Sequence, residues 1–533
     1  MTEAVRAATN SARERVGLNE HNRRWWTLAA MCFALFMIML DNTVVNVALP
    51  SIQRDLHASI SSLEWTVNAY TLSFAVLLVT GGRLGDLFGR RRMFLFGVVT
   101  FALSSAAIGF SPNDAWLVGG RAIQGIGAAF MMPGTLSIIS NAFPAHERGK
   151  AIGTWAGVSA MALAIGPVFG GFLVQNVSWQ SIFFLNLPVA ATAVVVTLFA
   201  THESRDETVE RVVDIPGVAA ITIGLTALVI ALVESNAWGW GSLRTISLLA
   251  TAAVGLVAFA VIERRVRAPM VDFSFFRSRS FFGANVVAFI VSFAMLAMFF
   301  FLALYLQNVE HYSPLQAGVR FLPATAMIII AGPLAGRLTD KIGPRVLMTA
   351  GLTVVAGSLF WQSYLDVGTP FGFLIGAFVL MGLGMGFVMS PMSTAAMNAV
   401  EATKAGVASG ILSMSRMVGG TFGVAVLGAL VVALGRSRLD ALPATSHLPA
   451  AARQKLADAL GASGVHGAPA QIVDASNHAF VYALQHGLRI GSAVALLGAL
   501  LAWTFVDGQV PARAPMPVQA EAASVGASAT PTA

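Results

Sequence analysis

Charged residues are scarce in this sequence. Asp, Glu, Lys and Arg make up 11% of its 533 residues, whereas a soluble domain usually carries about 25%. Hydrophobic residues make up 56% of the chain, and its mean hydropathy is +0.73. So little charge excludes an ordinary soluble globular protein. The composition predicts an integral membrane protein.

Several features on which other functions depend are also missing. Cys32 is the single cysteine, so no disulfide framework is expected. The sequence contains no GxxxxGK[ST] loop for nucleotide phosphates, no cluster of His and Cys at metal-ligand spacing and no nucleophile elbow. We therefore expect no metal site, no cofactor, no ATP-driven transport and no enzymatic activity.

Long apolar segments fill most of the chain. A helix needs about 20 mainly apolar residues to cross a bilayer, and segments of this kind recur fourteen times. The predicted spans are 27–49, 63–83, 93–111, 115–139, 150–174, 181–200, 213–234, 243–263, 282–306, 319–336, 346–365, 371–396, 405–435 and 483–506.

Basic residues concentrate in alternate loops between these spans. Arg23 and Arg24 precede the first span, three arginines at 90–92 follow the second, and three more at 264–267 lie between the eighth and ninth. Because Lys and Arg favour cytoplasmic loops, we expect both termini in the cytoplasm. The same distribution accounts for the net charge of +7 without a nucleic-acid partner.

A charged decapeptide occurs twice, as GRLGDLFGRR at 82–91 and GRLTDKIGPR at 336–345. Two glycine patterns recur at nearly the same offset, so the repeat relates spans 1–6 to spans 9–14 and leaves spans 7 and 8 as an inserted pair. Parallel repeats of this kind form the two halves of rocking transporters. The predicted fold class is an all-α membrane protein of two six-helix bundles with an inserted two-helix hairpin.

The repeat and the spans together divide the chain into five parts. The stretch AARQKLADAL inside the last long loop is typical of a helix, although the loop as a whole is expected to lie outside the cell. The parts are a cytoplasmic tail at 1–24, an N-terminal bundle at 25–200, linkers and inserted helices at 201–281, a C-terminal bundle at 282–506 with the external loop 436–482, and a disordered cytoplasmic tail at 507–533.

Several segments resemble signatures of the major facilitator superfamily. The decapeptide resembles its loop between helices 2 and 3, and the span count is similar to that of its fourteen-span drug/proton antiporter branch. Leu87 and Gln180 depart from the pattern, since the family usually has a basic residue at both positions. The other matching segments are LDNTVVNVALP at 40–50, LVGGRAIQGIGAA at 117–129, AIGPVFGGFL at 164–173 and WQSIFFLNLP at 179–188.

The resemblance implies a monomeric multidrug efflux transporter of the bacterial cytoplasmic (inner) membrane. It would exchange protons for lipophilic, often cationic, compounds, with the proton gradient as its only energy source. Its partners would be membrane lipids, small lipophilic molecules and protons, and no nucleic acid. Three alternatives stay open: export of one endogenous metabolite or antibiotic, proton-driven uptake, and a membrane sensor that transports nothing.

Charged residues inside the predicted spans are candidates for proton coupling. A charge at the bilayer centre costs at least about 2.5–3.5 kcal/mol on insertion scales. Asp41 and Arg121 would lie about 13 and 9 Å from the same membrane surface, at about 1.5 Å per helical residue, so they can meet. We predict that Asp41 alternates between Arg121, a proton and a cationic substrate; a static ion pair is the alternative. Glu234 and Arg416 are secondary candidates, more typical of an interfacial residue and of a packing brace.

Polar residues on central helices predict the substrate cavity, and a glycine-rich segment predicts the direction of transport. The Gly-Pro pair of span 5 resembles the antiporter motif, which exporters carry and uptake symporters generally lack. The expected cavity residues are Asn46, Asn68, Tyr70, Gln124, Tyr305 and Gln307, and those of the antiporter motif are Gly157, Gly166, Pro167, Gly170 and Gly171.

The acid in each copy of the decapeptide predicts a contact between the halves. A carboxylate is stabilised at a helix N-terminus, and cytoplasmic N-termini are expected near Lys150 and Ala405. Since the superfamily's first loop contacts the second half, we assign Asp86 to the start of span 13 and, by symmetry, Asp340 to the start of span 5. A pure orientation signal is the alternative. The predicted gating latch comprises Gly82, Asp86, Gly89, Arg90, Asp340, Gly343 and Arg345.

Overall fold

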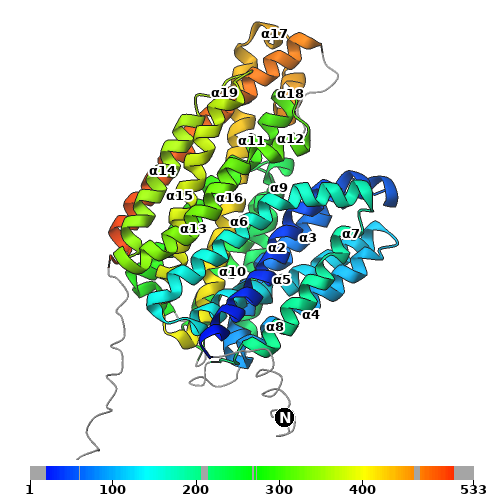
Figure 1. Cartoon of the computed structure of the whole chain (residues 1–533). Coiled ribbons are helices and arrows are strands. Elements are labelled where there is room, and N and C mark those ends of the chain that lie inside the picture. Colours follow the sequence, from blue (N-terminus) through cyan, green and yellow to red (C-terminus); the bar gives the residue numbers. More distant parts are fainter. Residues whose placement is uncertain are drawn as a thin grey trace, which may run out of the picture.

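The computed structural model describes residues 20–58, 60–205, 214–266, 269, 271, 273–460 and 469–508. In those ranges every regular element is a helix, and the long helices run side by side in one bundle (Figure 1). The predicted tails 1–24 and 507–533 lie almost wholly outside the described residues, as does Arg267.

Six predicted spans become the N-terminal half. Its first helix, α2 (Glu20–Leu56), does not stop near Pro50 as expected but continues six residues beyond it, since 56 − 50 = 6. A proline removes one backbone donor, and the packing of buried Ile52 beyond it holds the helix together. The remaining helices are α3 (Ile60–Phe88), α4 (Arg90–Gly109), α5 (Asp114–Ala142), α6 (Ala145–Asn176), α7 (Ser181–Phe184) and α8 (Asn186–Ala200).

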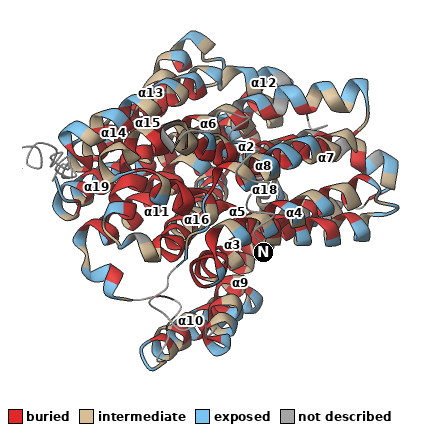
Figure 2. Cartoon of the chain, turned by 60° about the horizontal axis from the view of Figure 1, so that its bottom comes forward, coloured by how far each residue is buried: buried red, intermediate tan, exposed pale blue. Residues whose placement is uncertain are grey.

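The inserted pair stands at the edge of the bundle. It consists of α9 (Ile215–Trp238) and α10 (Leu243–Glu263). The first of these packs on α3 and on α16 (Ala405–Ala441), while α10 packs chiefly on α9. Figure 2 shows the exposed outer face of α10, whose apolar side chains include Val254 and Val257. Such a face suits contact with lipid.

The C-terminal half is more helical around residues 436–482 than predicted. The expected external loop 436–482 is mostly helical: α16 extends to Ala441, and α19 (Ala470–Phe505) begins thirteen residues before the predicted span at 483, since 483 − 470 = 13. Polar positions past the membrane boundary can continue a helix whose inner turns are already formed. The other helices and turns are η1 (Phe273–Arg277), α11 (Arg279–Leu304), the π turn η2 (Tyr305–Val309), α12 (Pro314–Arg320), α13 (Leu322–Ile342), α14 (Pro344–Gln362), α15 (Phe371–Asn398), η3 (Ala402–Lys404), α17 (Pro443–Ser446) and α18 (Ala450–Leu460).

Thirteen helices in the described ranges are long and apolar enough to cross a membrane. The remaining predicted span, 150–174, corresponds to α6, which is outside that set. It is nevertheless 32 residues long and packs along α2 and α13, which both belong to the set. The predicted fold class, two six-helix halves with an inserted pair, is therefore confirmed.

The two halves meet through the repeated glycines. A Cβ atom on Gly82 of α3 would lie 2.3 Å from the carbonyl oxygen of Gly406 on α16. At the equivalent place, a Cβ atom on Gly336 of α13 would lie 2.0 Å from the carbonyl oxygen of Gly149 on α6. Only glycine permits backbones to approach so closely. The internal repeat thus appears twice in the packing, as α3 on α16 and as α13 on α6.

Replacing Gly82 by Ala should separate α3 from α16, because the new methyl group meets backbone that cannot rotate away. We expect a loss of about 1–3 kcal/mol of stability. Gly357→Ala on α14 is the control, since a Cβ atom there meets nothing within 4 Å and alanine favours a helix by about 1 kcal/mol. The thermal unfolding midpoint of the purified protein measures both effects. Equal midpoints for Gly82→Ala and the wild type would contradict this packing.

Candidate functional site

A buried ion pair lies inside the N-terminal half. Asp41 of α2 is 4% exposed and Arg121 of α5 is 1% exposed. The Nη1 of Arg121 donates to Oδ2 of Asp41 at 2.6 Å, and its Nε donates to the carbonyl oxygen of Thr66 at 3.0 Å. The Arg121 guanidinium also faces the ring of Tyr70, with Cζ 4.2 Å from the centroid. The two predicted charges, Asp41 and Arg121, thus form an ion pair, and the predicted cavity residue Tyr70 packs against Arg121.

Amide groups complete the partners of the Asp41 carboxylate. Gln124 donates to Oδ1 of Asp41 at 2.9 Å and accepts from Nη1 of Arg121 at 2.6 Å. Asn186 donates to the same Oδ1 at 3.4 Å. Both amides also donate to the hydroxyl of Ser105, at 2.9 and 3.2 Å. Four helices, α2, α4, α5 and α8, therefore supply side chains to one buried network, which we name the Asp41 cluster: Asp41, Ser105, Arg121, Gln124 and Asn186.

Sequence reasoning missed two members of the Asp41 cluster. Asn186 lies in the stretch WQSIFFLNLP, which carried part of the family resemblance, so its position was available as a signal. Ser105 lies in an apolar helix whose sequence gives no such signal. Uncharged polar residues are common in membrane helices, and only the packing shows which of them face a charge.

The Asp41 cluster can exchange the partners of its carboxylate. A buried charge is stable only when it is paired and hydrogen-bonded. If Asp41 took up a proton, Arg121 would keep two acceptors, the side-chain oxygen of Gln124 and the carbonyl of Thr66. The amides of Gln124 and Asn186 carry both donors and acceptors, so they can serve either form of the acid. The geometry therefore tolerates a charged and a neutral Asp41.

The antiporter-type glycines bring α6 against the helix that carries Asp41. A Cβ atom on Gly166 would lie 1.8 Å from Oγ1 of Thr43, and one on Gly170 would lie 2.8 Å from Cγ1 of Val44. Gly157, in contrast, has its nearest neighbours on α13. Gly171 is half-buried, and the side chain of Pro167 is outside the described residues. Movement of α6 would therefore displace the residues of α2 that lie next to Asp41.

Asp86 holds the first turn of α16. Its carboxylate accepts from the backbone N–H of Gly406 at 3.0 Å and of Val407 at 2.8 Å. These N–H groups belong to the first turn, which has no partners within the helix. Arg90 pairs with the same carboxylate at 2.7 Å and donates to the carbonyl oxygen of Thr403 at 2.6 Å. Asp86 therefore lies at the start of span 13, where the sequence places it, and is completely buried.

Asp340 makes a weaker version of this contact. Its carboxylate accepts from the N–H groups of Gly149 and Lys150 at 3.1 and 3.2 Å. The predicted start of span 5 near Lys150 is wrong, because α6 begins at Ala145; Asp340 thus contacts the second turn rather than the free N-terminus. Asp340 is also only half-buried.

Sequence differences between the two decapeptides explain the asymmetry. Proline occupies position 344, where the first copy has Arg90, so Asp340 has no equivalent arginine partner. Arg345 instead donates to the carbonyl oxygen of Val506 at 2.6 Å and ties α14 to the end of α19. Gly89 and Gly343 have φ values of 113° and 82°, which other residues rarely adopt. They turn the chain tightly between two antiparallel helices in both copies.

The remaining predicted cavity residues do not gather at one site. Asn68 lines a narrow cleft between α3 and α9 together with Glu234. Tyr305 begins the π turn η2 after α11, and its hydroxyl oxygen lies 2.8 Å from Oε1 of Glu310 and 2.7 Å from the carbonyl oxygen of Asp366, either of which can accept its single proton. Gln307 is half-buried on the π turn η2, and the side chain of Asn46 is outside the described residues.

Arg416 faces the opposite half from the middle of α16. Its Cζ lies 5.8 Å from the ring centroid of Trp155 on α6. Within the described ranges no carboxylate pairs with its guanidinium. No group of three or more His, Cys, Asp or Glu in those same ranges could hold a metal ion.

Comparisons with known proteins agree on one family. The profile of the Major Facilitator Superfamily matches residues 31–424. The chain is 36% identical, over 95% of its length and 96% of the relative's, to the tetracenomycin C resistance and export protein of Streptomyces glaucescens. It is also 36% identical, over 92% and 93% of the two chains, to the puromycin resistance protein pur8 of Streptomyces alboniger.

A solved structure shows the same fold at much lower sequence identity. The human organic anion transporter MFSD10 superposes with a TM-score of 0.61 over 90% of this chain and 99% of its own, at 15% identity. Because a profile match over most of the chain and relatives above 30% identity agree with the repeated latch and the helix count, the protein belongs to the Major Facilitator Superfamily and is a multi-pass membrane protein.

Proposed function

We propose that this protein exports lipophilic compounds from the bacterial cytoplasm in exchange for protons. The observation that carries the proposal is the Asp41 carboxylate, buried in a membrane-spanning half and shared between Arg121 and two amides. An ionisable residue in such a place is a functional candidate by default. The names of the relatives, which describe resistance to antibiotics and their export, support the direction.

The exchange rests on competition for one carboxylate. In the charged form Asp41 pairs with Arg121; protonation, or the approach of a cationic substrate, replaces that pairing. A single carboxylate cannot serve a proton and a substrate at once, so release of one accompanies binding of the other. The glycine contacts of α6 with Thr43 and Val44 supply a path by which Asp41 and the halves affect each other.

The two acids of the decapeptides act as latches between the halves. Asp86 and Asp340 both bridge from one half to the other at the same end of the bundle. We assign this end to the cytoplasm because the arginines at 90–92 follow it directly. Breaking both bridges opens this end, and forming them closes it. The protein works as a monomer in the cytoplasmic membrane, with both termini inside and no cofactor.

Export of acidic lipophilic compounds is a second candidate, favoured by Arg416. Its guanidinium lies between the halves without a carboxylate partner in the described part of the chain. A charge without a partner inside a membrane protein is costly, and an anionic group on a substrate would compensate it. Export of one endogenous metabolite remains a narrower form of either candidate.

A panel of toxic compounds distinguishes these candidates. Cells that lack or overproduce the protein are loaded with tetraphenylphosphonium, a lipophilic cation, or with tetraphenylborate, an anion of similar size, and accumulation is measured. Lower accumulation of the cation alone supports the first candidate, and lower accumulation of the anion alone supports the second. Accumulation that is independent of the protein for every compound in the panel contradicts export.

Asp41→Asn should abolish proton-driven export of a lipophilic cation. The amide has nearly the same shape as the acid but does not titrate at physiological pH, so binding or downhill leakage of the substrate should persist. Asp41→Glu should keep part of the activity, because it restores the titrating group on a longer chain. Efflux from energised cells measures the loss, and binding to purified protein measures what remains. Wild-type efflux by Asp41→Asn would rule this carboxylate out as the coupling site, and Glu234 would be tested next.

Asp86→Asn should impair transport more than Asp340→Asn. The first change leaves Arg90 without its charged partner in a buried place, which costs about 1.5–3 kcal/mol per hydrogen bond to a charged group. The second keeps one acceptor oxygen and loses only one of two longer bonds of a half-buried side chain that has no arginine partner in the described ranges. Transport rates are compared at equal amounts of inserted protein. If both variants transport at the wild-type rate, the decapeptides serve membrane orientation only.

A further inference from the structure

The helix α4 begins with a sequence that disfavours a helix N-terminus. Its first three residues, Arg90, Arg91 and Arg92, are all basic, and its first turn contains no acid. A helix N-terminus carries a partial positive charge, so cations there are unfavourable. Gly89 precedes the helix and offers no side-chain hydrogen bond to its free N–H groups. Another part of the chain must therefore stabilise this helix end.

The segment 201–204, which follows α8, supplies the missing partners. The backbone N–H of Arg90 donates to the carbonyl oxygen of Ser204 at 2.9 Å. The backbone N–H of Arg91 donates to Oε1 of Glu203 at 3.0 Å. Glu203 thus caps α4 from outside that helix, and its negative charge lies at the positive helix end.

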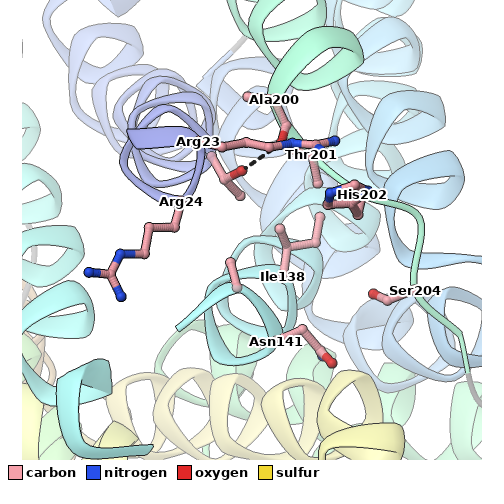
Figure 3. A pocket seen from close by; sticks show the side chains of 10 residues that line it. Arg23, Arg24, Ile138, Asn141, Ala200, Thr201, His202 and Ser204 are labelled. Atoms are coloured by element: carbon pink, nitrogen blue, oxygen red, sulfur yellow. Dashed lines mark hydrogen bonds between the residues drawn. The ribbon is translucent and has the colours of Figure 1, made fainter. Parts of the chain in front are cut away.

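Contacts with two helices fix the course of this segment. Just before it, the carbonyl oxygen of Ala200 accepts from Nε of Arg23 and from the hydroxyl of Thr27 on α2, at 2.8 and 3.1 Å (Figure 3). Next along the chain, the carbonyl oxygen of Thr201 accepts from Nη1 of Arg91 on α4 at 3.0 Å. The segment is therefore held in one place between α2 and α4.

The Glu203 carboxylate also contacts the turn before α4. A Cβ atom on Gly89 would lie 2.7 Å from Oε1 of Glu203 and 2.9 Å from Oε2, so a side chain there would displace the carboxylate. Oε2 of Glu203 lies 3.7 Å from Nε of Arg92. Because Arg92 is largely exposed, this ion pair contributes little. The hydrogen bond to the backbone and the charge at the helix end are the main contributions of Glu203.

Arg90 connects this helix end to the contact between the halves. Its guanidinium bonds to Asp86 through Nε at 2.8 Å and Nη2 at 2.7 Å. Nη2 also donates to the carbonyl oxygen of Thr403 in η3, at 2.6 Å. A planar guanidinium makes such a set of bonds only from one position of its backbone. We name Asp86, Arg90 and the first turn of α16 the Asp86 latch.

We propose that Glu203 is a positioning residue for the Asp86 latch. By capping α4 it fixes the backbone of Arg90, and it thereby favours the state in which the halves are joined at this end. The inference rests on the proposed function, in which the Asp86 latch opens and closes. It adds a residue from the end of the sixth helix of the N-terminal half, outside both decapeptides, which acts through Arg90.

Cysteine labelling measures the opening of this end without a transport assay. Ser409 of α16 is completely buried and donates to the carbonyl oxygen of Pro133 on α5 at 3.1 Å, so it lies between the halves. The parent protein for all variants carries Ser409→Cys together with Cys32→Ala, which removes the single native cysteine. Inside-out vesicles are treated with a membrane-impermeant maleimide. Because a buried thiol reacts only after the halves separate, the labelling rate reports opening.

Glu203→Ala should raise the labelling rate about fivefold, which is the change in an equilibrium that loss of one helix cap produces. Glu203→Gln keeps an oxygen that can accept from Arg91 and loses only the charge, so its rate should lie between those of the parent and Glu203→Ala. Its unchanged shape also makes a folding defect improbable as the cause. Asp114→Asn is the matched control, since Asp114 is an acid in the first turn of α5 at the opposite end of the half; it should label at the parent rate.

A double variant distinguishes positioning of Arg90 from general stabilisation of α4. Arg90→Gln alone should raise the labelling rate, because it removes the guanidinium that joins Asp86 to Thr403. If Glu203 acts through Arg90, adding Glu203→Ala to Arg90→Gln should raise the rate no further. If Glu203 only stabilises α4, the two effects should multiply.

The outcomes separate this inference from the proposed function. A parent-like rate for Glu203→Ala, or an effect of Glu203→Ala that is equally large with and without Arg90, overturns the role of Glu203. If Arg90→Gln alone raises the rate in that case, the Asp86 latch itself still stands. A parent-like rate for Arg90→Gln contradicts the Asp86 latch and overturns the inference with it.

Discussion

A charge inside a membrane protein must find its partner within the protein, because the surrounding lipid offers none. Asp86 meets this requirement with two backbone N–H groups of α16 and with Arg90. Asp41 meets it with Arg121, Gln124 and Asn186. The bonds from the N–H groups of α16 to Asp86 cross between the halves, whereas all described partners of Asp41 belong to one half. This difference separates the group that joins the halves from the group that we propose exchanges a proton.

The two sites are connected through glycine contacts rather than through charges. Gly82 and Gly406 allow α3 to touch α16 beside Asp86, and Gly166 and Gly170 allow α6 to touch α2 beside Asp41. Backbone that packs so closely cannot shift without moving its neighbour. Under the proposed function, opening the latched end would displace α3 and α6, and α6 would pass that displacement to the helix of Asp41. In our proposal, movement of the two halves and exchange of partners at Asp41 are therefore coupled.

The sequence predicts the large features of this protein because crossing a membrane requires long apolar segments and sorts basic residues into alternate loops. The two halves and the inserted pair are predicted from three features: fourteen apolar segments, a decapeptide that occurs twice, and basic residues in alternate loops. The contact of Asp86 with α16 is predicted from helix-end electrostatics together with the family resemblance, which implies that the first loop contacts the second half. The sequence also shows why the Asp340 contact is weaker than the Asp86 contact, because Pro344 stands where the first copy has Arg90. The position of Asp340 on α6, however, depends on where that helix begins. The contacts of Ser105 and the end of α2 depend on packing, and α16 and α19 continue from turns already formed inside the membrane; no local sequence pattern reports either.

The central claim is that Asp41 carries either a proton or a substrate. Its most direct test is the number of protons released when the exported compound binds to the purified protein in weakly buffered solution. The account predicts that wild-type protein releases protons on binding at a pH where Asp41 is protonated, and that Asp41→Asn binds the compound without releasing them. Equal proton release by the wild type and Asp41→Asn, or binding to the wild type with no release at any pH, would contradict it.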